Sequence, residues 1–164
     1  MLTVLFKKLF LGLDGMSSAG VVLQLDEPTL LFAKLGDILA DEAALKLAFD
    51  AKGASGLRPC QLCKNVRMKG SDLANRDATH YFIKITCPDV TRFDLLTVTD
   101  MFQAMDLLLA SRDTKTKKEF DQLQMSLGHN WNPHGLLADQ ALRRHVLPIS
   151  TLTYDPMHLS LIHI

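Results

Sequence analysis

The stretch "GDILADEAALKLAFDAKG", residues 36–53, decides the fold because two kinds of secondary structure meet in it. Its apolar beginning is typical of the end of a strand, and its Ala- and Leu-rich remainder, closed by Gly53, predicts a helix. Asp41 falls where the strand gives way to the helix. An aspartate there either caps the helix or, at the end of a strand, holds Mg²⁺ for phosphoryl chemistry. Asp37 and Glu42 compete for either role.

The segments on both sides predict a small sheet. Residues 21–35, "VVLQLDEPTLLFAKL", are two apolar runs around a polar, Pro-containing turn, which predicts a hairpin. Residues 53–78 form a polar loop region dotted with glycine. The β-branched and aromatic content of "HYFIKITC", residues 80–87, then favours one further strand.

Helices dominate the rest of the chain. Residues 97–111 predict a helix that Thr97 or Thr99 can cap, residues 115–128 repeat the pattern until Gly128 ends it, and residues 132–148 suggest a short third helix. Strands followed mostly by helices predict an α+β fold. In the first helix these residues are expected to share one apolar face: Met101, Phe102, Met105, Leu108 and Leu109.

Composition narrows the function classes. The chain of 164 residues carries 18 Lys+Arg and 18 Asp+Glu, so it has no overall basic character. This balance argues against a dedicated, charge-driven nucleic-acid binder, but not against a local basic patch. Three cysteines make a poor disulfide framework, which favours a reducing, intracellular compartment. The opening "MLTVLFKKLFLGL" is apolar, but Lys7 and Lys8 divide it into runs too short for a membrane span. We expect an amphipathic helix there and no membrane partner.

The most informative pair for chemistry is Cys60 and Cys63 in "GLRPCQLCKNV", residues 56–66. Two thiolates at this spacing can both reach one Zn²⁺, which then needs two further ligands. The same spacing also occurs in redox-active pairs, although those usually open a helix within a βαβ unit. A third alternative is a pair of structural thiols without a metal.

Several side chains could complete a zinc site. Cys87 is one, and His158 stands out because "YDPMH" places it after a turn that Pro156 fixes. None of the histidines is persuasive on spacing alone, because a lone histidine is more often a surface or core residue. The six are His80, His129, His134, His145, His158 and His163.

Two groups of basic residues could contact phosphate, although most such runs are solvated faces. One lies between the cysteine pair and the strand at residues 80–87. The other begins the helix at residues 115–128, with two arginines further on. The first comprises Arg58, Lys64, Arg67, Lys69 and Arg76; the second comprises Lys115, Lys117, Lys118, Arg143 and Arg144.

The order of these motifs resembles that of the DDE transposases of the CACTA type. Asp41 begins "DEAALK", Cys60-x-x-Cys63 follows 19 positions after it, and "DPMH" lies far downstream. The stretches "LADEAA", "KGASG" and "LCKNV" are also similar to the transposon-derived proteins of dinoflagellate genomes. The resemblance covers about residues 20–158.

The resemblance implies an RNase H-like catalytic core interrupted by a zinc-containing, mostly helical insertion. It maps Asp41 onto the second Mg²⁺-binding carboxylate, and Cys60, Cys63 and His158 onto ligands of a structural Zn²⁺. The expected domains are a partial catalytic core at 1–53, with its hairpin and helix, and an insertion domain at 54–158. The parent partner would be transposon-end DNA, which implies a nuclear location, and a homo-oligomer is an option.

Two departures from the family pattern concern the catalytic acids. The first acid should lie on a strand further upstream; Asp14 is the candidate for that position, and its segment does not fit. The third should lie beyond His158. We therefore expect a piece of a transposase that is inactive alone, because a single acid cannot hold two metal ions. The alternatives are a non-enzymatic zinc-stabilised module that binds protein or nucleic acid, and an orphan redox protein.

The last residues, "LSLIHI" at 159–164, have a separate explanation. A DNA sequence that encodes these residues resembles the mosaic-end adapter of sequencing libraries. We therefore expect this tail to be adapter-derived, against the alternative of a genuine apolar strand. If the tail is adapter-derived, the spacing between His158 and His163 carries no information about a zinc site.

Overall fold

The computed structural model describes residues 2–34, 36–67, 82–84, 86–144 and 152–154. Within this part of the chain, small two-stranded sheets combine with helices that supply most of the core, so the predicted α+β class is confirmed. The opening segment is helical, as expected: α1 (Leu2–Phe6) runs into a π-helical turn over Lys7–Leu11.

The predicted hairpin consists of the antiparallel strands β1 (Val21–Gln24) and β2 (Pro28–Leu31), with Val21 opposite Leu31. Its side chains are largely exposed, including the apolar Leu30. A two-stranded hairpin without a packed face is only marginally stable in water. The hairpin therefore contributes little to the core.

A second sheet joins segments from distant parts of the sequence. Strand β3 (Ile38–Ala40) pairs in parallel with β6 (Leu152–Tyr154), so that Ala40 lies opposite Tyr154. The helix α2 (Glu42–Ala48) begins directly after β3, as the sequence predicts. The predicted ranges 1–53 and 54–158 are thus connected through this strand pair.

The two long helices have the boundaries that their capping residues dictate. In α3 (Val98–Ser111) the Thr97 hydroxyl accepts from the Asp100 N–H and the Asp100 carboxylate accepts from the Thr97 N–H, a reciprocal capping box. Thr116 and Glu119 repeat this arrangement at the start of α4 (Lys117–Leu127). Gly128, with φ +77°, ends α4 in the left-handed conformation that glycine adopts most easily.

The main core lies where α2, α3 and α4 meet. Met101, Met105 and Leu108 of α3 are buried as predicted, whereas Leu109 is exposed, so the expected apolar face was one residue too wide. Partly buried apolar residues of α4 pack against the same cluster. The buried members of the cluster are Leu45, Phe49, Met101, Met105, Leu108, Leu136, Leu137 and Leu142.

A smaller cluster surrounds the cysteine pair. Its strands are β4 (Val66–Arg67) and β5 (Ile83–Lys84), which pair in parallel with Val66 opposite Ile83. Cys63, Val66 and Ile83 are its buried residues. Of the strand expected over residues 80–87, only these two positions are extended within the described residues.

The region of the expected third helix, residues 132–148, was predicted incorrectly in its described part. Residues up to 141 form turns, and only Leu142–Arg144 make a short 3₁₀ helix. The reason is tertiary: Asn132 donates from Nδ2 to the Asp50 carboxylate at 3.0 Å and accepts at Oδ1 from the His134 N–H at 3.0 Å. These bonds fix a turn where a helix would have to start.

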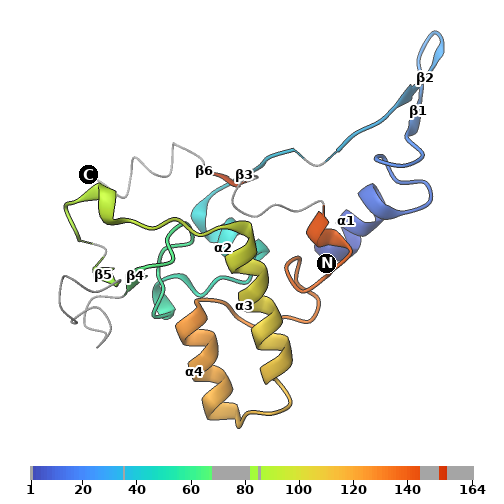
Figure 1. Cartoon of the computed structure of the whole chain (residues 1–164). Coiled ribbons are helices and arrows are strands. Elements are labelled where there is room, and N and C mark those ends of the chain that lie inside the picture. Colours follow the sequence, from blue (N-terminus) through green and yellow to red (C-terminus); the bar gives the residue numbers. More distant parts are fainter. Residues whose placement is uncertain (1, 35, 68–81, 85, 145–151, 155–164) are drawn as a thin grey trace.

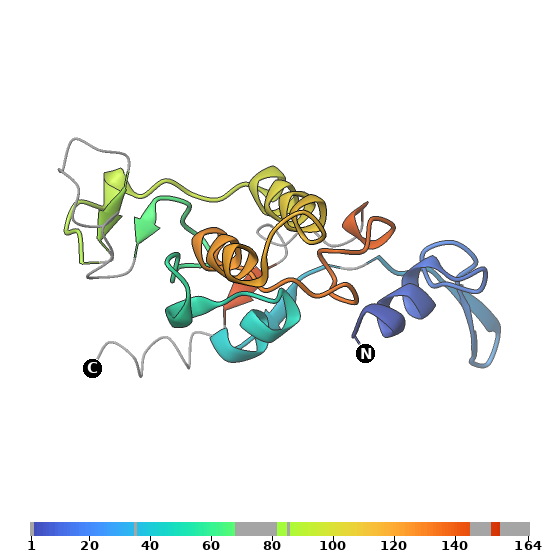
Figure 2. The same ribbon diagram turned by 90° about the horizontal axis from the view of Figure 1, so that it is seen from below.

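Figure 1 shows the arrangement of these parts: α2, α3 and α4 occupy the centre, the β1–β2 hairpin lies at one end, and β4 and β5 lie at the other. The view from below in Figure 2 gives the same order. No helix within the described ranges is both long and apolar enough to cross a membrane.

Candidate metal site around Cys60 and Cys63

The turn that carries the two cysteines is held against the segment before α3. The Lys64 N–H donates to the Asp94 carbonyl at 2.9 Å, and the Leu96 N–H donates to the Leu62 carbonyl at 2.8 Å. A 3₁₀ turn, Gly53–Ser55, connects this region to the end of α2. Backbone hydrogen bonds to the segment before α3 therefore fix the cysteine turn, and the two cysteines do not lie in a helix.

Cys60 and Cys63 are neighbours with free thiols. Cys63 is buried, and Cys60 is half-buried. Burial raises the pKa of the Cys63 thiol to about 12, with further contributions from its hydrogen bond to Cys60 and from the negative charges of Cys60 and Asp94. A bound cation would reverse this balance, because metal coordination deprotonates a thiol.

The raised pKa bears on the redox alternative. A redox-active pair needs one cysteine whose thiolate is stabilised by a helix N-terminus or a nearby cation. Cys63 has the opposite environment, and the pair lies in a turn rather than at the start of a helix. Cys63 therefore does not supply the nucleophilic thiolate, and in a redox-active pair Cys60 would have to supply it.

The other candidate zinc ligands do not all lie in the described part of the chain. Cys87 packs on the same small cluster as Cys63, and its Sγ lies 3.8 Å from the Asp89 carbonyl. His158 lies outside the described residues, as do His80, His145 and His163. In the part that the structure describes, no three His, Cys, Asp or Glu side chains gather into a group that could hold a metal ion.

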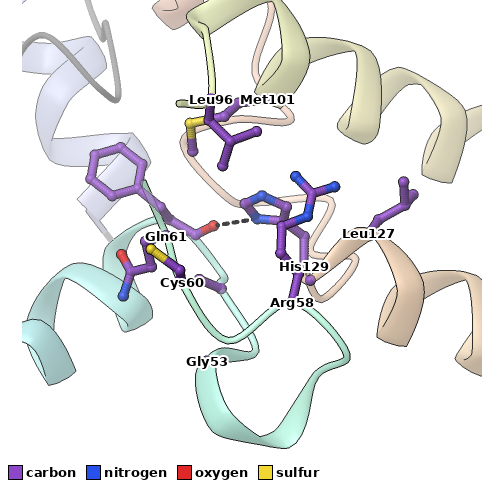
Figure 3. A pocket seen from close by; sticks show the side chains of 11 residues that line it. Gly53, Arg58, Cys60, Gln61, Leu96, Met101, Leu127 and His129 are labelled. Atoms are coloured by element: carbon purple, nitrogen blue, oxygen red, sulfur yellow. Dashed lines mark hydrogen bonds between the residues drawn. The ribbon is translucent and has the colours of Figure 1, made fainter. Parts of the chain in front are cut away.

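His129 lines the same cavity as Cys60. This cavity, with about 10 Å³ of free space, lies between the cysteine turn, the start of α3 and the end of α4. That is about the volume that one water molecule needs. Figure 3 shows Cys60, Gln61 and His129 around it, together with Arg58.

The imidazole of His129 is buried and oriented. Its Nδ1 lies 3.3 Å from the carbonyl oxygen of Phe49. Burial, reinforced by the nearby Arg58 cation, lowers the pKa of His129 from 6.5 to about 4. The ring is therefore neutral at pH 7, which is the form that binds metal ions.

Asp41 occupies the junction that the sequence predicts. Its Oδ1 accepts from the Ala44 N–H at 2.6 Å, which makes it the N-cap of α2. The capping role is thus present in the structure. A carboxylate has two oxygens, so the cap does not by itself prevent Asp41 from also binding Mg²⁺.

Two of the basic residues around the cysteine pair, Arg67 and Lys64, make contacts within the local fold. Arg67 is buried, donates to the carbonyl of Lys64 at 2.8 Å and stacks 4.1 Å from the ring centre of Phe82. Lys64 forms an ion pair with Asp94 at 3.3 Å. A buried guanidinium cannot reach a nucleic-acid backbone, so Arg67 is removed from the candidates for phosphate contact. Lys69 and Arg76 lie outside the described residues.

The sequence singled out His158 among the six histidines and did not distinguish His129 from the others. The signal that separates it is its position after Gly128, the glycine that ends α4 and turns the chain back into the core. Comparison of the chain with family models, with curated proteins and with solved structures gives no match.

Proposed function

We propose that the chain is part of a transposon-derived DDE transposase of the CACTA type, whose parent cleaves and joins DNA strands with Mg²⁺. The motifs of residues 41–46, 60–63 and 155–158 suggest this family. The observation that supports it best is the parallel pairing of β3 with β6, because it connects the outer two motifs. Asp41 follows Ala40, the last residue of β3, and "YDPMH" begins with Tyr154, the last residue of β6.

Parallel strands place their carboxyl ends at the same edge of a sheet, which is where open α/β sheets hold their ligands. An acidic residue directly after such a strand is suited to holding a divalent cation. In the parent, carboxylates at this edge would hold two Mg²⁺ ions that activate a water or a 3′-hydroxyl and stabilise the leaving oxygen. Asp41 would be one of these carboxylates.

The cysteine pair supports the second part of the proposal, a structural Zn²⁺ in the helical insertion. Two thiols side by side in a turn, one of them buried, are a donor set that suits Zn²⁺. The ion would hold the cysteine turn in addition to the backbone hydrogen bonds and the small apolar cluster that the structure shows there. The resemblance adds His158 to Cys60 and Cys63 as a ligand.

The test of the catalytic proposal is a strand-cleavage assay on the complete reading frame from the source genome. The expected result is Mg²⁺-dependent cleavage of transposon-end DNA that Asp41→Asn reduces by at least about 100-fold. Asparagine caps helices as well as aspartate does, so this variant removes the charge and keeps the cap. Full activity of Asp41→Asn would refute the assigned role of Asp41.

The competing function is a non-enzymatic, zinc-stabilised binding module. The observation that favours it is the engagement of Asp41 Oδ1 in the helix cap, which gives this residue a structural role. Such a module would bind a partner through surface residues and would need no acid at the sheet edge. A complete reading frame that binds zinc but cleaves no DNA with any divalent cation would support it.

A further inference from the structure

We propose that a pocket between α1, α2 and the turn at residues 132–136 binds a small organic cation. The charged group of the ligand would lie on the carboxylate of Asp50, and its apolar part on the leucines of the pocket wall. Neither the two cysteines nor Asp41 lines this pocket. The proposal is therefore independent of both parts of the proposed function.

The size and the lining of the pocket suit a small molecule. Its volume of about 400 Å³ lies within the range of roughly 300–1,000 Å³ that is typical of ligand pockets. Leu47 of α2 lines it with 82% of its surface exposed, whereas Leu136 on the turn is buried. A ligand with an apolar body would therefore remove the Leu47 side chain from water. The other apolar residues of the lining are Leu2, Ala44 and Ala48.

The polar part of the pocket contains a carboxylate with a free oxygen. Among the described residues that line the pocket, Asp50 is the only acid, and there is no lysine or arginine. Its Oδ1 accepts from Nδ2 of Asn132 at 3.0 Å, and its Oδ2 makes no hydrogen bond within the described part of the chain. An ionised carboxylate only accepts hydrogen bonds, so Oδ2 is suited to an ammonium or guanidinium donor.

Burial adds a reason for a cation. It raises the pKa of Asp50, because desolvation disfavours the charged carboxylate, although the hydrogen bond from Asn132 acts in the opposite direction. A bound cation would offset this desolvation. An anionic ligand would face the negative charge without a compensating cation, and a neutral apolar ligand would leave Oδ2 without a donor.

The backbone places this carboxylate where glycine is the usual residue. Asp50 follows the last residue of α2 with φ +53°, and the N–H of Ala51 donates back to the carbonyl of Lys46 at 2.9 Å. Helices that end in this way usually have glycine at the left-handed position, because other residues are strained there. Glycine would end α2 equally well, but it would leave the pocket without an acid.

Gly135 accommodates the same carboxylate from the other side. It lines the pocket, and a Cβ at this position would overlap Oδ2 of Asp50. The turn can therefore approach the carboxylate this closely only because residue 135 has no side chain. Two local features of the sequence, a strained acid and a glycine facing it, thus combine to hold one carboxylate at the pocket.

The test compares three probes that share one apolar chain and differ in the head group: hexylamine, which is a cation at pH 7, hexanol and hexanoate. Isothermal titration calorimetry with the wild-type chain measures their affinities. We expect hexylamine to bind at least about 10-fold more tightly than hexanol, and hexanoate not to bind. In nuclear magnetic resonance spectra, hexylamine should shift the amide signals of Ala48 and Gly135 and leave that of Thr116 unchanged.

A charge-removing variant and a matched control locate the effect. Asp50→Asn keeps an acceptor for Asn132 and tolerates a positive φ, so it removes only the charge. Its affinity for hexylamine should fall at least about 10-fold, to that for hexanol. Asp113→Asn removes an exposed acid outside the pocket and should change nothing.

Several results would overturn the proposal: no binding of hexylamine, equal affinities for hexylamine and hexanol, an unchanged affinity in Asp50→Asn, or shifted amide signals only outside the pocket. Circular dichroism checks that Asp50→Asn is folded. If it is not folded, the comparison of the three probes on the wild-type chain decides. Neither zinc content nor strand cleavage enters this test, so its failure would leave the proposed function unaffected.

Discussion

The imidazole of His129 is hydrogen-bonded through Nδ1 to the carbonyl oxygen of Phe49, a residue 80 positions earlier in the chain. Phe49 ends α2 and belongs to the main core, whereas His129 follows the end of α4 and lines the cavity beside Cys60. This contact therefore connects the helical core to the candidate metal site. It also makes the protonation of His129 relevant to folding.

The first prediction concerns pH. The pKa of His129 is lowered from 6.5 to about 4 in the folded chain, so the unfolded chain binds more protons between these values. Stability should then fall as the pH drops from about 6.5 to about 4, by about 3 kcal/mol in total. Urea unfolding of the chelator-treated wild-type protein across this range measures the loss. In His129→Gln this pH-dependent loss should be absent; an equal loss in the variant would contradict the assignment to His129.

The second prediction concerns the cap of α2. Asp41→Ala removes the acceptor for the Ala44 N–H and should lower the free energy of unfolding by about 1 kcal/mol. Asp41→Asn should have almost no effect, because asparagine is an equally good cap. The measurement is urea unfolding followed by circular dichroism. Equal stability of the alanine and asparagine variants would show that the cap contributes nothing.

The third prediction concerns Gly128. Its φ of +77° is unfavourable for any residue with a Cβ, and an added Cβ would lie 3.1 Å from the carbonyl oxygen of Arg58. Gly128→Ala should therefore destabilise the chain by about 1–2 kcal/mol. Gly36→Ala is the matched control, because nothing lies within 4 Å of the added carbon there. A Gly128→Ala variant as stable as Gly36→Ala would contradict the described end of α4.

The fourth prediction concerns the reactivity of Cys63. With a pKa of about 12, its thiolate fraction at pH 8 should be about 1,000-fold lower than that of an ordinary cysteine. Iodoacetamide labelling of the metal-free chain, followed by peptide mass spectrometry, should find Cys63 modified correspondingly slowly. In a redox-active pair the rapidly modified thiol would be that of Cys60, so the labelling of Cys60 tests the redox alternative. Modification of Cys63 at the rate of an unfolded reference peptide would rule out the described environment.

The features that could be predicted from the sequence are those that local interactions determine. The boundaries of α3 and α4 follow from Thr97, Thr116 and Gly128, because capping boxes and left-handed glycines act within one helical turn. The hairpin likewise followed from its polar turn. The position of Asp41 at the junction of strand and helix was predicted for the same reason.

Interactions between distant residues could not be predicted in this way. The pairing of Ala40 with Tyr154 and the bond between Asn132 and Asp50 depend on segments that meet only in the folded chain. The hydrogen bond between Asn132 and Asp50 fixes a turn in the region where a helix was expected. The burial of His129 at the cavity that Cys60 also lines has the same origin, since it is a product of tertiary packing.

Zinc binding by Cys60 and Cys63 is the central claim about this chain. The decisive measurement is the metal content of the chain purified without chelator, compared with Cys60→Ser. We predict about one zinc ion per wild-type chain and almost none in the variant. Equal metal content in the two proteins, or wild-type protein that does not take up added zinc, would contradict the central claim.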